Sequence, residues 1–286
     1  MGPASGRSAP PGGLGGASIA RRLGAPQTMI PLALLAVLLF TAVFAGAISP
    51  SSRVTAIHPE KRLLPPGPEH WFGTDALGRD VFTRIIHGGR LSLALGIIPS
   101  LASMFFALLL GSASGYFGGR LDEVTMRVTD ALLCVPGALL SLALASALGP
   151  GFISLLAALT VSQVPHFTRI VRSITLTIVE NEYIAAAADA GAGHWRIISR
   201  HVIRNALGPV IVQTAFSMAG MILTGAGLSF IGLGAQPPAP EWGAMLSDAR
   251  EFLRRAPHLA VFPGAFILVS ALCFNMLGDA LRDALD

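Results

Sequence analysis

The chain has 286 residues, of which 52% are hydrophobic and only 13% are charged, whereas about a quarter of the residues in an ordinary soluble domain are charged. The formal net charge is +4, but the basic residues are scattered between apolar stretches, which argues against a nucleic-acid-binding surface. The two cysteines, Cys134 and Cys273, both lie in apolar stretches, so neither a disulfide framework nor a zinc motif is expected.

Long stretches without any Asp, Glu, Lys or Arg dominate the sequence. A soluble α/β core, the competing interpretation, would need turn residues far more often than a stretch such as 205–240 offers. A helix of about 20 apolar residues crosses the hydrocarbon core of a bilayer. The sequence therefore predicts an all-α polytopic membrane protein with about six transmembrane helices, at about 29–48, 91–115, 128–148, 151–170, 206–234 and 257–278.

The N-terminal residues 1–28 are rich in Gly, Pro, Ser and Ala, and are expected to form a disordered cytoplasmic tail. The apolar run 29–48 is interpreted as an uncleaved first transmembrane helix. A cleaved signal peptide is the alternative, but its apolar part would be shorter and nearer the start. The polar segment 49–90 is expected outside the cytoplasm, with a short amphipathic helix over 75–90. Residues 91–286 then form a five-helix core domain.

The orientation follows from basic residues next to the spans. Arg21 and Arg22 precede the first span, which favours an N-terminus in the cytoplasm. With six spans the C-terminus is expected on the same side. The segment 176–205, between the fourth and fifth spans, is then a cytoplasmic loop.

The sequence of that loop predicts a helix, a turn at a glycine and a second helix. Asn181 is a candidate N-cap, and Glu182 in the first turn suits the positive end of the helix dipole. Gly191 can take the left-handed conformation that ends a helix. Arg196 and Arg200 then recur at helical spacing in a second helix. An alanine-surfaced helix can fit a groove closely, so a docking element is one interpretation. An amphipathic helix lying on lipid headgroups is the other.

Four segments carry a family resemblance: in chain order they are Phe72–Val81, Glu182–Asn205, Leu228–Gly243 and Phe274–Asp286. Together they resemble the permeases of ATP-binding cassette (ABC) importers for dipeptides, oligopeptides or nickel. Phe72–Val81 is similar to the FGTDxxGRD signature of that family. Glu182–Asn205 is similar to its EAA motif, although Ala185 stands where the motif often has Glu, and Arg204 where it often has Pro.

The resemblance implies the type I ABC importer permease fold, and it carries over two sets of residues. Those expected to couple the chain to an ATP-binding subunit are Glu182, Tyr183, Ala185, Ala186, Ala187, Gly191, Arg196 and Arg200. Those of the signature before the second span are Gly73, Asp75, Gly78, Arg79 and Asp80.

The resemblance also implies a multi-pass protein of the plasma (inner) membrane, embedded in the lipid bilayer. Its implied partners are a second homologous permease subunit, two ATP-binding subunits and an extracytoplasmic substrate-binding protein, and no nucleic acid. Di- or oligopeptide uptake is the implied function, with nickel or a metal chelate as the alternative substrate. The substrate-binding residues stay unassigned.

The chain's own residues fit a subunit that performs no chemistry. Lys61 is the only lysine and no GxxxxGK[ST] loop exists, so ATP and Mg²⁺ are expected in the partner subunits. The HExxH and GxSxG motifs are missing too, so neither catalytic residues nor a metal site is predicted. A proton-coupled secondary transporter is a remote alternative, because Asp130, Asp279 and Asp283 lie at span edges rather than at mid-span.

Overall fold

The computed structural model describes residues 26–285. In that range the chain is helical, and the only extended pairing there is an antiparallel bridge between Thr74 and Asp80. The elements in chain order are α2 (Pro26–Val43), α3 (Ala45–Ile48), α4 (Ser52–Thr55), η1 (Pro59–Lys61), α5 (Val81–Phe117), α6 (Gly119–Leu133), α7 (Gly137–Leu148), α8 (Phe152–Val179), α9 (Glu182–Asp189), α10 (His194–Ile197), η2 (Ile198–Val202), α11 (Ile203–Phe230), α12 (Trp242–Ala249), η3 (Arg250–Phe252) and α13 (His258–Leu285).

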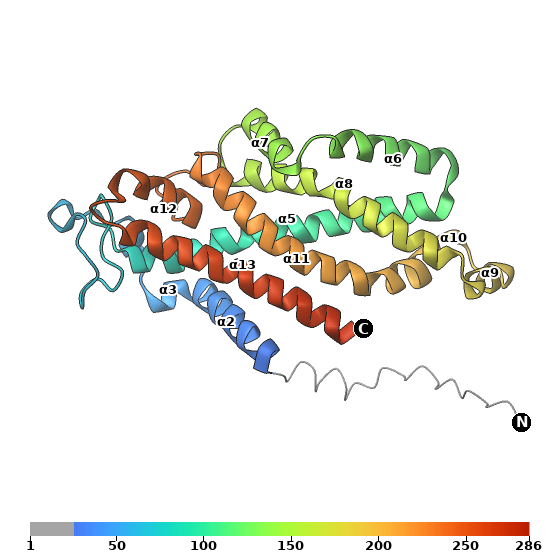
Figure 1. Ribbon diagram of the computed structural model, residues 1–286, viewed down its shortest axis with the longest axis horizontal. Coiled ribbons are helices and arrows are strands. Elements are labelled where there is room, and N and C mark those ends of the chain that lie inside the picture. Colours follow the sequence, from blue (N-terminus) through green and yellow to red (C-terminus); the bar gives the residue numbers. More distant parts are fainter. Residues whose placement is uncertain (1–25, 286) are drawn as a thin grey trace, which may run out of the picture.

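The long helices α5, α8, α11 and α13 lie alongside one another along the longest axis of the molecule, and α2 packs against α5 and α13 (Figure 1). The short helix α12 lies at one end of this bundle and α9 at the other. These two ends are called the α12 end and the α9 end below. The expected disordered tail over 1–28 lies outside the described residues, except for 26–28, which begin α2.

Each expected span falls on helical structure, but not every one is a single straight helix. The runs Val81–Phe117, His194–Phe230 and His258–Leu285 are long and apolar enough to cross a membrane, and α6 with α7 would make a fourth, bent span. The first expected span is divided into α2 and α3 at Phe44. At this break, Nε of Arg90 on α5 donates a hydrogen bond to the carbonyl oxygen of Ala42, at 2.6 Å. The guanidinium thereby supplies a partner at a helix end where carbonyls lack one.

The short amphipathic helix expected over 75–90 is helical only from Val81 onward, and it is the first part of a longer helix. Residues 75–80 form a loop, and the helix that starts at Val81 continues without a break to Phe117. Gly88 and Gly89 do not stop it, because both lie against the indole ring of Trp242. Close packing of two glycines against an aromatic ring stabilises a helix that local propensity alone would weaken.

The expectation of one span over 128–148 also needs correction. α6 and α7 meet at an angle of 89°, and the break lies at Val135 and Pro136, because proline lacks an N–H group and disfavours a helical residue before it. Arg172 of α8 donates to both carboxylate oxygens of Asp122. This ion pair holds the start of α6 against α8. α7 also packs on α8, so both helices of the bent pair contact the same long helix.

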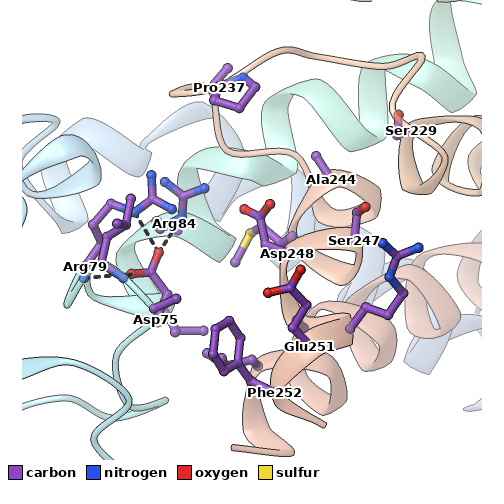
Figure 2. Close-up of a pocket in the computed structure, with 18 of the residues that line it drawn as sticks. Asp75, Arg79, Arg84, Ser229, Pro237, Ala244, Ser247, Asp248, Glu251 and Phe252 are labelled. Atoms are coloured by element: carbon purple, nitrogen blue, oxygen red, sulfur yellow. Dashed lines mark hydrogen bonds and ion pairs between the residues drawn. The ribbon is translucent and has the colours of Figure 1, made fainter.

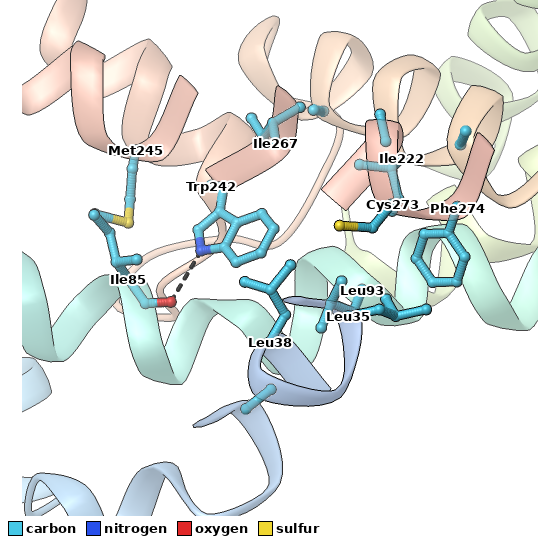
Figure 3. Close-up of a cluster of buried hydrophobic side chains, with 14 of the residues drawn as sticks. Leu35, Leu38, Ile85, Leu93, Ile222, Trp242, Met245, Ile267, Cys273 and Phe274 are labelled. Atoms are coloured by element: carbon cyan, nitrogen blue, oxygen red, sulfur yellow. Dashed lines mark hydrogen bonds between the residues drawn. The ribbon is translucent and has the colours of Figure 1, made fainter. Parts of the chain in front are cut away.

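A core cluster at the α12 end joins α2, α5, α11, α12 and α13 around Trp242. The Trp242 indole is buried and its Nε1 donates to the carbonyl oxygen of Ile85, at 2.9 Å (Figure 3). Leu35 and Leu38 of α2 reach the same cluster. A second cluster at the α9 end joins α5, α8, α9 and α11.

Candidate functional site

The first candidate site is the helix α9, which projects at one end of the bundle (Figure 1). Ile184 is its only buried residue, with 5% of its surface exposed, and it packs with Ile178, Ile197 and Val202. A single isoleucine therefore anchors α9 to the bundle. The remaining expected coupling residues of this helix are exposed or half-buried: Glu182, Tyr183, Ala185, Ala186 and Ala187.

The turn after α9 has the geometry that the glycine predicts. Gly191 has φ of 84°, its N–H donates to the Ala188 carbonyl oxygen at 2.9 Å, and the Ala192 N–H donates to the Ala187 oxygen at 3.0 Å. These two bonds form a Schellman motif, which satisfies the last carbonyl groups of the helix. No atom lies within 4 Å of the place where a Cβ of residue 191 would be. Backbone conformation, and not lack of space, is therefore what favours glycine here.

Asn181 behaves differently from the prediction. It occupies the N-cap position of α9, but its side chain makes no capping hydrogen bond there. Its Nδ2 instead donates to the carbonyl oxygens of Thr177 and Ile178, at 3.0 and 2.9 Å. The Asn181 side chain thus provides hydrogen bonds to carbonyl groups near the end of α8. At the start of α9, only the negative charge of Glu182 favours the helix dipole.

The second arm of the loop is not a separate helix. α10, a π-helical turn η2 and α11 form one continuous run from His194 to Phe230. Arg196 and Arg200 are exposed on it. Trp195 is 71% exposed, whereas Ile197 and Ile198 are buried.

Two polar contacts hold this arm against the rest of the α9 end. Asn205 Nδ2 donates to the hydroxyl oxygen of Tyr183 on α9, at 3.1 Å. The hydroxyl of Tyr116, on α5, lies 2.9 Å from Nδ1 of His194. Sequence reasoning missed both tyrosine contacts, because they join residues far apart in the chain. The result is an alanine-surfaced helix held in a defined place beside exposed arginines.

The signature residues lie at the opposite end, in the loop before α5. Asp75 organises this loop, since its Oδ1 accepts from the N–H groups of Leu77 and Arg79, each at 2.9 Å. Its Oδ2 lies 2.6 Å from Nε of Arg79 and 3.6 Å from Nε of Arg84. Arg84 was not among the expected residues, although it follows Asp80 by one helical turn.

The two signature glycines are required by close contacts. Gly73 and Gly78 have φ of 76° and 75°. A Cβ at residue 78 would lie 1.8 Å from the carbonyl oxygen of His58, and one at residue 73 would lie 2.5 Å from that of Leu64. Asp80 lies at the N-cap of α5, with Oδ2 4.0 Å from His70 Nδ1. Burial raises the pKa of Asp80, and the nearby His70 opposes that rise.

Glu241, at the start of α12, completes this end of the molecule. Its side chain is fully buried and accepts from the N–H groups of Gly243 and Ala244, at 2.8 and 3.0 Å. The hydroxyl of Ser92 donates to it at 3.0 Å. Burial raises the pKa of Glu241, and these hydrogen bonds partly offset that effect. Sequence reasoning placed Glu241 in a family segment without recognising it as a helix cap.

A cavity of about 600 Å³ opens between the signature loop, the loop from α11 to α12, and the helices α12 and η3. Asp75, Arg79 and Arg84 lie on one side of it, and Asp248 and Glu251 on the other (Figure 2). The signature residues thus form part of the wall of a pocket at the α12 end, far along the bundle from the coupling residues of α9.

A helical bundle with apolar spans, an exposed alanine helix at one end and a polar loop cluster at the other defines a polytopic membrane permease. The chain belongs to the family of binding-protein-dependent transport system inner membrane components, which matches residues 107–286. It is thus a transport subunit of an ABC importer in the inner membrane, not an enzyme, and ATP hydrolysis belongs to separate subunits.

Three relatives illustrate the similarity. The dipeptide transport system permease protein DppC of Alkalihalophilus pseudofirmus is 43% identical over 258 residues, which cover 90% of this chain and 84% of that protein. The glutathione transport system permease protein GsiD of Pectobacterium atrosepticum is 44% identical over 221 residues, 77% of this chain and 73% of that protein. The probable D,D-dipeptide transport system permease protein DdpC of Escherichia coli is 38% identical, covering 92% and 88%.

Proposed function

We propose that this chain forms part of the pathway for uptake of di- or oligopeptides, and that α9 transmits movement to it from an ATP-binding subunit. Relatives with 38% to 44% identity are named as permeases for dipeptides, D,D-dipeptides or glutathione, all of them short peptides. None of these names favours nickel, the alternative substrate. The substrate proposal rests on this agreement across relatives that cover most of the chain.

The coupling proposal rests on one observation, the exposed alanine face of α9. Ala185 and Ala186 leave a smooth surface that another backbone can approach closely, while Ile184 fixes the helix to the bundle. Arg196 and Arg200 lie beside it and offer charge-assisted hydrogen bonds to acidic groups of a partner. A helix held by Ile184 and by the hydrogen bond between Asn205 and Tyr183, with its alanine face exposed, is suited to seating in a cleft.

The proposed orientation places the α9 end in the cytoplasm and the α12 end outside. Arg196, Arg200 and Arg204 cluster at the α9 end, as expected for a cytoplasmic loop. The start of α2 and the end of α13 point toward the same side (Figure 1). Both termini are therefore proposed to be cytoplasmic.

The chain works with other components of a transport complex. We propose as specific partners a second permease subunit, two ATP-binding subunits that carry the ATP and Mg²⁺, and a substrate-binding protein on the outer side. The binding protein would deliver the peptide at the α12 end, and the ATP-binding subunits would act at the α9 end.

The coupling proposal is tested with Ala186→Trp, which adds a large ring to the exposed face of α9. The control is Ala131→Trp, at another exposed alanine, in the last turn of α6. Both variants are expressed with the remaining subunits in membranes. We expect Ala186→Trp to reach the membrane at a normal level, to release the ATP-binding subunits on purification and to lower labelled-dipeptide uptake by about ten-fold or more. Unchanged uptake in Ala186→Trp would show that α9 is not the coupling helix.

A further inference from the structure

One face of α11 carries polar and small residues where a membrane helix facing lipid would carry apolar ones. This surface, called the Ser217 face below, consists of residues that recur every three or four positions and therefore share one side of the helix: Gln213, Ser217, Gly220, Thr224 and Gly227. It lies between Arg204 and Glu241, the nearest charged residues before and after it in the sequence, and so within a membrane span. No atom of another helix lies within 4 Å of the place where a Cβ of Gly220 or Gly227 would be. This chain therefore leaves the Ser217 face uncovered at both glycines.

A glutamine from a second helix joins the Ser217 face. The helices α5, α8 and α11 lie against one another (Figure 1). Gln163, on α8, donates from Nε2 to the hydroxyl oxygen of Ser217, at 3.2 Å. The hydroxyl oxygen of Ser100, on α5, lies 3.2 Å from the same atom. Because Gln213 lies one helical turn before Ser217, the two glutamines occupy neighbouring positions inside the membrane.

These side chains hold hydrogen-bonding groups that the chain itself does not use. A glutamine amide offers two N–H donors and a carbonyl oxygen that accepts. Among residues 26–285, Gln163 donates only to Ser217 and its Oε1 accepts from no group, while the Gln213 amide and the Thr224 hydroxyl form no hydrogen bond. None of these unpaired atoms is enclosed by the protein. Since each would cost several kcal/mol if hydrocarbon covered it, lipid tails are a poor cover for this face.

The helices α2 and α13 show the contrasting, lipid-facing kind of surface. Between Val261 and Leu272 every exposed side chain of α13 is apolar, and the same holds for α2 between Met29 and Val43. In Figure 1, α2 and α13 lie together on one side of the bundle and α8 lies on the other. The face that carries the amides is therefore distinct from the apolar surface that suits lipid.

We propose that the Ser217 face lines the translocation pathway, and that Gln163 and Gln213 hydrogen-bond to the backbone of the peptide as it passes. A peptide backbone presents N–H donors and carbonyl acceptors whatever its side chains are, and a side-chain amide can serve both. The open space beside Gly220 and Gly227 admits a peptide close to α11. This inference rests on the proposed function and assigns to it residues that contact the substrate inside the membrane.

The first test asks whether water reaches the Ser217 face in the complete transporter, reconstituted in liposomes. Thr224→Cys, a substitution of similar size, is made in a chain whose own cysteines, Cys134 and Cys273, are replaced by alanine. A charged methanethiosulfonate reagent, added to both sides of the membrane, modifies a thiolate in water but not a thiol in hydrocarbon. We expect reaction at Thr224→Cys, without nucleotide or with ATP bound, and none at the control Leu272→Cys on the apolar surface of α13. An unreactive Thr224→Cys in both states would mean a face covered by lipid or by the second permease subunit, and would overturn the proposal.

The second test asks whether a glutamine recognises the peptide backbone. Uptake of dialanine is compared with uptake of its ester analogue, in which an oxygen replaces the backbone N–H, by the unaltered transporter and by Gln213→Leu. Selection by the substrate-binding protein is the same in both transporters and cancels when their kcat/KM ratios for the two compounds are compared. We expect Gln213→Leu to reduce the preference for dialanine by about three-fold or more, because a hydrogen bond to the N–H is lost.

An unchanged preference in Gln213→Leu would overturn the proposal. Failure of the proposed substrate class would show differently, as no dialanine uptake by the unaltered transporter. The reaction at Thr224→Cys needs no peptide, so it reports on the pathway in either case.

Discussion

Two glycines with nearly the same backbone conformation differ in their surroundings, and this difference predicts different costs of an added methyl group. Gly78 has φ of 75° and Gly191 has φ of 84°. A Cβ at residue 78 would lie 1.8 Å from the carbonyl oxygen of His58, whereas one at residue 191 would meet nothing within 4 Å. The free-energy cost of Gly191→Ala thus comes only from the left-handed conformation. The cost of Gly78→Ala includes a clash with the backbone of His58 as well.

The magnitudes follow from these contacts. A left-handed conformation costs an L-residue about 1–2 kcal/mol, which is the whole expected loss for Gly191→Ala. Overpacking adds about 1–3 kcal/mol or more, and the fixed backbone of His58 cannot move aside as a flexible side chain would. We therefore expect Gly78→Ala to lose about 2–5 kcal/mol in unfolding free energy. At about 2–4 °C per kcal/mol, its melting temperature should fall markedly further than that of Gly191→Ala.

The assay is thermal unfolding of each purified variant in the same detergent, followed by loss of the monodisperse peak in size-exclusion chromatography. Gly232→Ala is a second control, since Gly232 has φ of 93°, ends α11 with the same pair of Schellman hydrogen bonds and also has open space around it. It should resemble Gly191→Ala. Equal melting temperatures for Gly78→Ala and the two controls would refute the argument that the contact with His58 requires glycine.

A further expected outcome concerns the buried indole of Trp242. Trp242→Phe removes the hydrogen bond to the Ile85 carbonyl oxygen and should lower stability by about 1–3 kcal/mol, measured by the same thermal assay. Trp71→Phe, at a tryptophan that is 65% exposed, should have almost no effect, and equal losses would contradict the role of the buried indole.

The sequence by itself determined the helical class, the approximate places of the spans and the identity of the segments that matter. Charge-free stretches of about 20 residues or more leave few alternatives to membrane helices. The Schellman turn was also predictable, because Gly191 follows the alanine run of α9 and glycine adopts positive φ without strain. These features depend on residues that are neighbours in the chain.

Only the tertiary structure decided how those segments are used. Local pattern suggested that residues 75–90 form a short helix, yet burial of Val81 and Ile85 in the core around Trp242 extends α5 into this segment. Asp75 and Asp248 are far apart in the sequence, and nothing in either segment predicts that they face one cavity. Local propensity acts within a few residues, whereas cavities and ion pairs arise from packing between distant ones, and that packing assembled the pocket at the α12 end.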